Sequence, residues 1–274
     1  MSNFAGKDAF AAVGFITPYL MMFNSVGFLF GTGGSALIAK LLGAKQEADA
    51  NEAFSSLILA SVCTGMLLSM IGQLCLKPVA LLQGAQGALL ENSLLYGRIY
   101  LLGPPACLVL FEFQTLYQTS GKGRLGLKAA VLSGLINIGL DGLLLAGFGL
   151  GTEGAAAATV FSQWVGGLLP LIYYSRKNDS QLRLVRGRFR GRELLTMCAN
   201  GSSEMVNTVS ISVVSLVYNT LLLSYAGSDG IAVYGIMTYV SFLFTAVFWG
   251  YISGVAPIIS FHYGAGIMRS CTAS

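Results

Sequence analysis

The sequence predicts an all-α protein that crosses a membrane several times. Of its 274 residues, 54% are hydrophobic and only 10% are charged, and the mean hydropathy is +0.70. This composition is too apolar for a protein whose whole surface meets water. In hydrocarbon every backbone group must be paired within its own segment or in a closed barrel, and the alternation typical of barrel strands is absent. A polytopic helical membrane protein follows.

Seven stretches are long and apolar enough to span. A helix needs roughly 20 apolar residues to cross a hydrocarbon core about 30 Å thick. The predicted spans are residues 10–39, 53–76, 93–118, 126–148, 154–175, 194–224 and 230–262. Prolines that interrupt these helices free carbonyl groups, which favours bends; we single out Pro18, Pro104, Pro105 and Pro257. The first stretch lacks the pattern of a cleaved signal peptide and is predicted to remain as a span.

The basic residues are concentrated in alternate loops. If the spans alternate in direction, 13 of the 16 lysines and arginines fall on one side: Lys40, Lys45, Lys122, Arg124, Lys128, Arg176, Lys177, Arg183, Arg186, Arg188, Arg190, Arg192 and Arg269. The positive-inside bias assigns this side to the cytoplasm and the N-terminus to the outside. The densest run, RLVRGRFRGR at 183–192, is interpreted as a topology-setting loop, with a nucleic-acid or anionic-lipid patch as the alternative.

The chain also contains an internal repeat. Shifting the sequence by 221 residues aligns 5–44 with 226–265 without a gap, and 12 of the 40 positions are identical, including Asp8 with Asp229 and Gly43 with Gly264. Parallel repeats in transporters are related by an axis along the membrane normal. The span at 194–224 has no counterpart before the first copy. We therefore expect one further helix before Met1 and about four after Ser274, twelve in all.

Several segments resemble, in order, the multidrug and toxic compound extrusion (MATE) family. They are GKDAFAAVGFITP, GTGGSALIAKLLGA, QTSGKGRLGLKAAVLSGLINIGLDGLLL, GTEGAAAATVFSQ, NGSSEMVN and SGVAPIISFHYGAG. The resemblance implies a twelve-helix exporter of drugs and organic cations, with two six-helix lobes and inward H⁺ or Na⁺ movement as the driving force. Residues 1–175 then form an N-lobe without its first helix, 176–193 a basic cytoplasmic linker, and 194–274 the first two helices of the C-lobe.

Polar residues within the spans are the candidate site. Asn137 and Asp141 lie on one helix face, a turn apart, and Thr159 lies on the next helix, whose GAAAAT run permits close packing. Carboxylate, amide and hydroxyl oxygens suit Na⁺, and a buried aspartate can instead carry a proton. In the resembling family these three positions match an N-lobe cation site, which also uses an aspartate on the first helix that this chain lacks. A helix-packing hydrogen-bond network is the alternative.

Two glutamates and two aromatic residues are secondary candidates. Glu112 is expected either to line a cavity or to pair with Arg98 or backbone donors. Glu204, near the start of the sixth span, is expected to cap the helix or pair with a loop; the alternative, which the resemblance implies, is an acid at the C-lobe cavity. Tyr117 and Trp164 are candidates for stacking on aromatic cations, with ordinary packing as the simpler interpretation.

Other functions fit less well. A lipid-linked oligosaccharide flippase of the same superfamily needs a cationic cavity for pyrophosphate, whereas the buried charges here are acidic. A seven-helix receptor fits the span count but not the repeat. An enzyme is not predicted, because no nucleophile and base pair is visible and His262 is the only histidine. We expect no cofactor beyond the coupling ion, no metal beyond Na⁺, cationic small-molecule substrates, a plasma-membrane location, no nucleic acid and no obligate protein partner.

Overall fold

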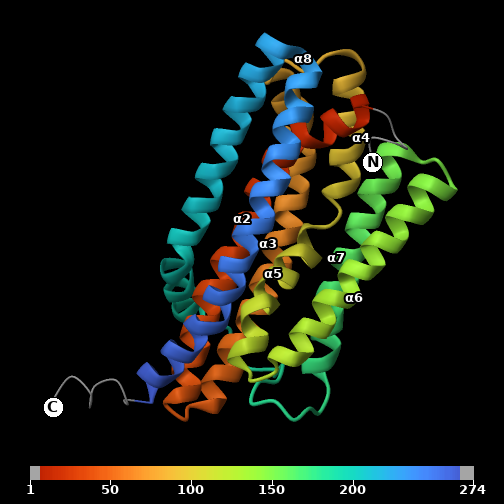
Figure 1. Ribbon diagram of the computed structural model, residues 1–274. Coiled ribbons are helices and arrows are strands. Elements are labelled where there is room, and N and C mark those ends of the chain that lie inside the picture. The colour runs from red at the N-terminus through yellow and green to blue at the C-terminus, as the bar shows by residue number, and fades with distance from the viewer. Residues whose placement is uncertain (1–6, 266–274) are drawn as a thin grey trace.

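The computed structural model describes residues 7–265, and every regular element in that range is a helix (Figure 1). The elements are α2 (Lys7–Gly43), α3 (Glu47–Leu82), α4 (Gly87–Tyr100), α5 (Pro104–Thr119), α6 (Gly123–Asp141), the π-helix η1 (Gly142–Gly147), α7 (Gly151–Ser175) and α8 (Gly191–Gly264). Six helical segments are long and apolar enough to cross a membrane, or seven if the bent pair α4 and α5 forms one span. The predicted class is confirmed, and each predicted span falls on one of these segments.

The third span is broken next to the predicted proline pair. α4 and α5 meet at an angle of 65°, separated by residues 101–103. Carbonyl groups at the break accept side-chain hydrogen bonds from other helices: Leu101 O from Ser69 Oγ, Arg98 O from Gln73 Nε2 at 2.7 Å, and Leu102 O from Trp164 Nε1 at 3.2 Å. An unpaired carbonyl in hydrocarbon destabilises by several kcal/mol. These three bonds therefore allow the break to exist within the bundle.

The helix α8 consists of two spans, Gly191–Gly227 and Asp229–Gly264. The break lies at Gly227, whose φ of +61° and ψ of −156° are accessible to glycine and strained for other residues. Figure 1 shows the chain reversing direction there. The rings of Tyr218 and Tyr234 stack across the reversal, with centroids 5.6 Å apart. The two halves of α8 thus correspond to the sixth and seventh predicted spans.

The basic loops gather at one end of the bundle. In Figure 1 the loops at residues 44–46, 120–122 and 176–190 lie at the lower end, together with the end of α8. The loops at 83–86 and 148–150 and the reversal at Gly227 lie at the upper end. The alternation that the sequence predicts for the basic residues is therefore present in the fold. Arg269 lies outside the described residues.

Helix α2 and the second half of α8 pack against each other as the repeat requires. A Cβ atom on Gly43 would lie 2.1 Å from Phe261 O, and a Cβ atom on Gly264 would lie 2.1 Å from Lys40 O. These two contacts are the same contact under the 221-residue shift, which exchanges Gly43 with Gly264 and Lys40 with Phe261. Only glycine permits so close an approach of two backbones.

The same symmetry holds along the rest of the pair. Phe28 and Trp249 are equivalent under the shift, and their rings lie 5.0 Å apart, centroid to centroid. Near the upper end a Cβ on Gly14 would lie 3.9 Å from Ile231, and one on Gly235 would lie 3.8 Å from Phe10. The two repeat copies therefore run parallel and in register about a local two-fold axis.

Candidate functional site

Asp141 lies where the α-helix of α6 gives way to the π-helix η1. π-Helical turns are rare and occur often at functional sites. The Asp141 side chain is half-buried, and its Oδ1 atom is buried with no hydrogen-bond partner among the described residues. Asn137 lies one turn earlier on the same helix and is also half-buried. The site therefore presents a carboxylate oxygen that is neither hydrated by bulk water nor bonded to protein.

Thr159 and Tyr96 complete the surroundings of Asp141. The Thr159 hydroxyl donates to Ala155 O in its own helix at 2.9 Å. Tyr96, from α4, is buried with its hydroxyl near Thr159, and Asp141 lies within electrostatic range of it without a hydrogen bond. The structure thus brings two of the three predicted residues near one tyrosine, with Asn137 a turn away. Within the described residues no group of three histidine, cysteine or acidic side chains converges in the manner of a metal site.

A buried polar network next to this site was not predicted from the sequence. Asn24 Nδ2 donates to the Tyr100 hydroxyl at 2.8 Å, and Gln163 Nε2 donates to the same hydroxyl at 3.2 Å. Cys107 Sγ contacts Asn24 Oδ1 at 3.5 Å. Gln163 Oε1 is buried and has no partner in the described part of the chain. The sequence did contain a signal for this network. Asn24 and Gln163 are each the single side-chain amide of a long apolar span, and such residues usually form hydrogen bonds between helices.

A cavity of about 270 Å³ opens on the other side of the tyrosines, between α2, α4 and α8. Its walls are aromatic and hydroxylated, and none of its lining residues is charged; the tyrosines are Tyr96, Tyr100, Tyr234 and Tyr239, and the hydroxyl groups belong to Thr17, Ser212, Ser215 and Thr238. Tyr96 therefore lines this cavity and also lies within electrostatic range of Asp141.

A larger cavity of about 610 Å³ lies between α5, α6 and the second half of α8. Tyr117 lines it, together with Phe28, Trp249 and the amides Gln114 and Gln118, and none of the lining residues is charged. Trp164 takes another position. Its side chain is 38% exposed, and its indole N–H is bonded to the carbonyl at the α4–α5 break, so it faces the surroundings of the bundle.

The two glutamates lie in different surroundings, one within the packed core and one at a cavity. Glu112 is fully buried and accepts a hydrogen bond from the Ser61 hydroxyl of α3, while its Oε2 has no partner among the described residues. Arg98 is exposed on α4, so the expected pairing with it does not occur. Glu204 lies more than three turns into α8, because the helix begins at Gly191. It lines a polar cavity of about 220 Å³ with Thr32 and Asn207 and does not cap the helix.

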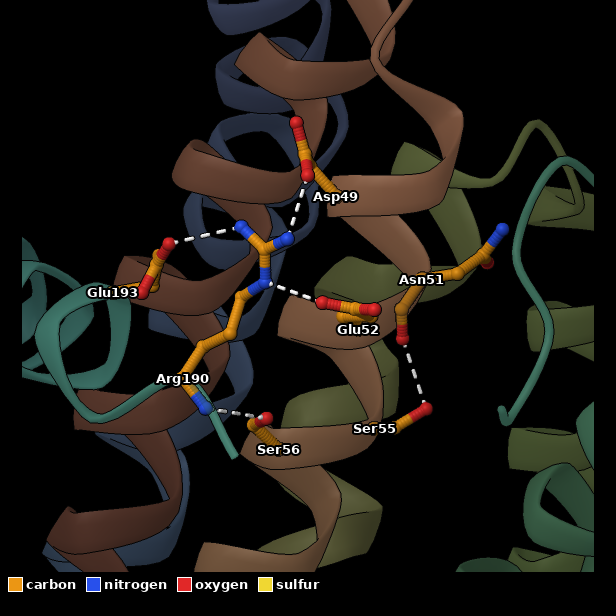
Figure 2. Close-up of polar contacts among 7 residues, drawn as sticks. All are labelled: Asp49, Asn51, Glu52, Ser55, Ser56, Arg190 and Glu193. Carbon is orange, nitrogen blue, oxygen red and sulfur yellow. Dashed lines mark hydrogen bonds and ion pairs between the residues drawn. The ribbon is translucent and has the colours of Figure 1, made fainter. Parts of the chain in front are cut away.

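The linker at residues 176–190 is hydrogen-bonded to the start of α3, and Figure 2 shows this contact at Arg190. We call this attachment of the linker to α3 the strap. The backbone N–H groups of Arg183, Val185 and Arg190 donate to Asn51 Oδ1, Ser55 Oγ and Ser56 Oγ at 2.7, 2.9 and 3.1 Å. The linker thus ends three residues before the predicted boundary. Its backbone donors are met by polar side chains at the start of α3; Asn51 and Ser55 lie one helical turn apart, and Ser56 is adjacent to Ser55.

Arg190 closes the strap with three ion pairs. Its guanidinium lies 2.6 Å from Asp49, 2.8 Å from Glu52 and 3.0 Å from Glu193, as Figure 2 shows. The hydrogen bond to Glu52, followed by those to Glu193 and Asp49, raises the pKa of Arg190 above its ordinary value. The arginine therefore joins the start of α3 to the start of α8 at the basic end of the bundle.

Long apolar helices, with a buried and unpartnered acid oxygen and cavities between them, define a multi-pass helical membrane protein. A profile described as MatE matches residues 1–143, which is more than half of the chain. The chain belongs to the MatE family, whose members are transporters and not enzymes.

Named relatives agree with this assignment. The "Multidrug export protein MepA" of Staphylococcus saprophyticus is 28% identical over 254 residues, which cover 92% of this chain and 56% of that protein. The protein of the same name from Staphylococcus aureus strain MRSA252 is 25% identical over the same shares. The chain thus spans about half the length of these relatives.

Solved structures share the fold. The MATE multidrug transporter DinF-BH in complex with R6G has a TM-score of 0.87 and 25% identity, over 96% of this chain and 59% of that one. Inward-facing and outward-facing structures of a multidrug resistance MATE family transporter superpose with TM-scores of 0.82 and 0.83 at 22% identity. They cover 94% and 93% of this chain and 57% of theirs, and they support the fold alone.

Proposed function

We propose that this chain is the Asp141-bearing part of an exporter that expels cationic, drug-like molecules in exchange for inward H⁺ or Na⁺. The observation that carries the proposal is the buried Oδ1 of Asp141, which has no partner among the described residues. A buried carboxylate without a partner is strongly destabilised, so it binds a proton or a cation whenever one is available. Release of that ion is what an antiporter couples to its substrate.

The cavities of about 270 Å³ and 610 Å³ suit organic cations, because their linings contain aromatic rings and carry no charged side chain. Tyrosine faces attract cations through the ring quadrupole, and four tyrosines line the 270 Å³ cavity. Tyr96 belongs to this cavity and to the surroundings of Asp141. Ionised Asp141 would attract a cation in the cavity through the electrostatic field near this ring, and a proton or Na⁺ bound to Asp141 would neutralise the carboxylate and remove that attraction. That competition is the physical basis we propose for exchange.

Orientation in the membrane follows from the charge distribution. Twelve of the 13 lysines and arginines assigned to the basic side are described, and they lie in or next to the loops that Figure 1 places at the lower end. Arg190 among them is neutralised by ion pairs, and those without an ion pair in the described part of the chain include Lys45, Lys122, Arg124 and Arg188. The positive-inside rule assigns that end to the cytoplasm, and we propose the plasma membrane as the location. The flippase alternative is disfavoured, because none of the residues lining the three cavities described above is basic.

Dye accumulation in an efflux-deficient bacterium tests the proposal. The chain is expressed alone and as a chimera in which its residues 7–265 replace the matching part of the S. saprophyticus export protein. We expect the chimera to lower ethidium accumulation and Asp141→Asn to abolish that effect, while Asp179→Asn, an exposed acid of the linker, leaves it unchanged. Equal export by the Asp141→Asn chimera would refute the coupling role, and a well-inserted chimera without export would refute the drug-exporter assignment.

A further inference from the structure

A groove of about 400 Å³ runs between α6 and α7 at the basic end of the bundle. On α6 it is lined by Leu125, Lys128 and Leu132, which are three and four residues apart and share one helix face. On α7 the lining residues Leu169, Ile172 and Tyr173 follow a similar spacing, and Arg176 and Lys177 come directly after the end of this helix. Tyr117 and Ala129 border both this groove and the 610 Å³ cavity.

The charged part of the groove is purely cationic. Lys128, Arg176 and Lys177 are exposed, and no acidic residue lines the groove. The ion pairs found among residues 7–265 all involve Arg190, so these three cations have no carboxylate partner there. Asp179 follows two residues after Lys177 but is not part of the lining. The groove therefore concentrates three positive charges that the fold leaves uncompensated.

The rest of the groove is apolar and open to the side. Leu132 is 45% exposed and Ile172 is 49% exposed, and both lie on the membrane side of the three cations, farther along their helices from the basic end. In a bilayer these side chains meet acyl chains, whereas the cations lie at headgroup depth. A tyrosine at this level, Tyr173, adds an amphipathic ring suited to the interface. The cations are therefore followed along the groove by apolar side chains, as the charged headgroup of a phospholipid is followed by its acyl chains.

We propose that this groove binds an anionic phospholipid, with its headgroup phosphate among Lys128, Arg176 and Lys177 and an acyl chain along Leu132 and Ile172. Basic pockets between transmembrane helices bind anionic headgroups by this combination of charge and apolar contact. The site is distinct from Asp141 and its cavity, and it does not depend on the exported substrate. An occupied groove would hold α6 and α7 together at the end opposite the Asp141 region.

Quenching by brominated lipids measures the selectivity of the groove. Trp164→Phe and Trp249→Phe remove both tryptophans, and Tyr173→Trp then places a single reporter in the groove of the full chain. In nanodiscs we expect brominated phosphatidylglycerol to quench this reporter at lower mole fraction than brominated phosphatidylcholine. The triple change K128Q/R176Q/K177Q should weaken that preference by about fivefold or more, since each cation near the surface contributes on that scale.

A matched control separates a site from general surface charge. R124Q/R183Q/R188Q removes the same charge from exposed positions at the same end, outside the groove lining. We expect this control to keep the preference for phosphatidylglycerol. Equal loss in both triples, or equal quenching by the two lipids, would overturn the proposal. Relief of quenching by inorganic phosphate at the lipid's own concentration would also overturn it, since the occupant would be a free anion. If the groove triple fails to fold, Lys128→Gln alone is compared with Arg124→Gln.

Discussion

The side-chain amide of Asn219 donates to the backbone carbonyl of Gly14 across the interface between α8 and α2, at 3.3 Å. Pro18, four residues after Gly14, has no N–H group, so this carbonyl lacks its helical partner. The same amide lies 3.3 Å from Phe15 O. Asn219 is almost fully buried, so no water replaces it. One side chain of α8 thus repairs the interruption in α2 and ties the two helices together.

Replacing Asn219 with Leu should destabilise the protein mainly through Gly14. The carbonyl would be buried without a partner, which lowers the free energy of unfolding by about 1–3 kcal/mol. In a Pro18→Ala background the N–H of residue 18 can bond to Gly14 O, and the same change should cost about 1 kcal/mol less. Thermal unfolding in detergent of the four proteins gives this double-mutant cycle. Equal losses in both backgrounds would show that Asn219 acts through packing alone.

The contact between Gly43 and Gly264 should tolerate no side chain. A methyl group at either position would lie 2.1 Å from a carbonyl oxygen, so Gly43→Ala and Gly264→Ala should each lower the free energy of unfolding by about 1–3 kcal/mol. Gly250→Ala is the control, because a Cβ there meets nothing within 4 Å and alanine favours the helix by about 1 kcal/mol. Unchanged melting temperatures for the first two variants would mean that the helices are not held at this distance.

Arg190→Gln should loosen the linker. Exposed ion pairs contribute up to about 1 kcal/mol each, so loss of three partly exposed pairs should weaken the strap by about 1–2 kcal/mol. Trypsin should then cleave the linker faster at its other arginines, and added salt should speed cleavage of the unaltered chain toward the same rate. Arg188→Gln, an exposed position outside the ion pairs, removes one charge and one cleavage site without this effect. Cleavage at equal rates in both variants would contradict the strap.

Alkaline pH should not open the strap. The hydrogen bonds raise the pKa of Arg190 in the folded protein. A group whose pKa is raised on folding contributes stability that is complete below its unfolded pKa and is lost only as the pH passes the folded value. For arginine both values lie above the range in which proteins remain folded. The tryptic rate at the linker, corrected for the activity of the protease, should therefore stay constant from neutral to moderately alkaline pH.

The positions of the spans were predictable because hydrocarbon, as the solvent around these helices, sets their length and composition. Length and apolar content determine whether a helix can cross hydrocarbon; six of the seven predicted spans are single helices of sufficient length, and the seventh is the bent pair α4 and α5. The break at the proline pair was also predictable, since Pro104 lacks a backbone N–H. The repeat could be read because equivalent glycines such as Gly43 and Gly264 are constrained by the same contact.

The partners of the buried polar groups were not predictable from spacing. Asp141, Thr159 and Asn137 share helix faces that the sequence reveals, but the role of Tyr96 depends on how α4 bends at the break. Glu112 was expected to line a cavity or meet Arg98, and it meets Ser61, because the rotation of α3 against α5 decides which face is inside. Asn219 repairs a proline more than 200 residues away in sequence, a pairing that only the packed bundle displays.

Coupled transport in vesicles tests the central role of Asp141 most directly. The chimera is reconstituted, an inward H⁺ or Na⁺ gradient is imposed, and ion entry is recorded when ethidium is added to the interior. We expect ethidium to accelerate ion entry in the unaltered chimera, Asp141→Glu to retain part of this coupling, and Asp141→Asn to abolish it. Undiminished substrate-dependent ion entry with Asp141→Asn would contradict the assignment of Asp141 as the coupling group.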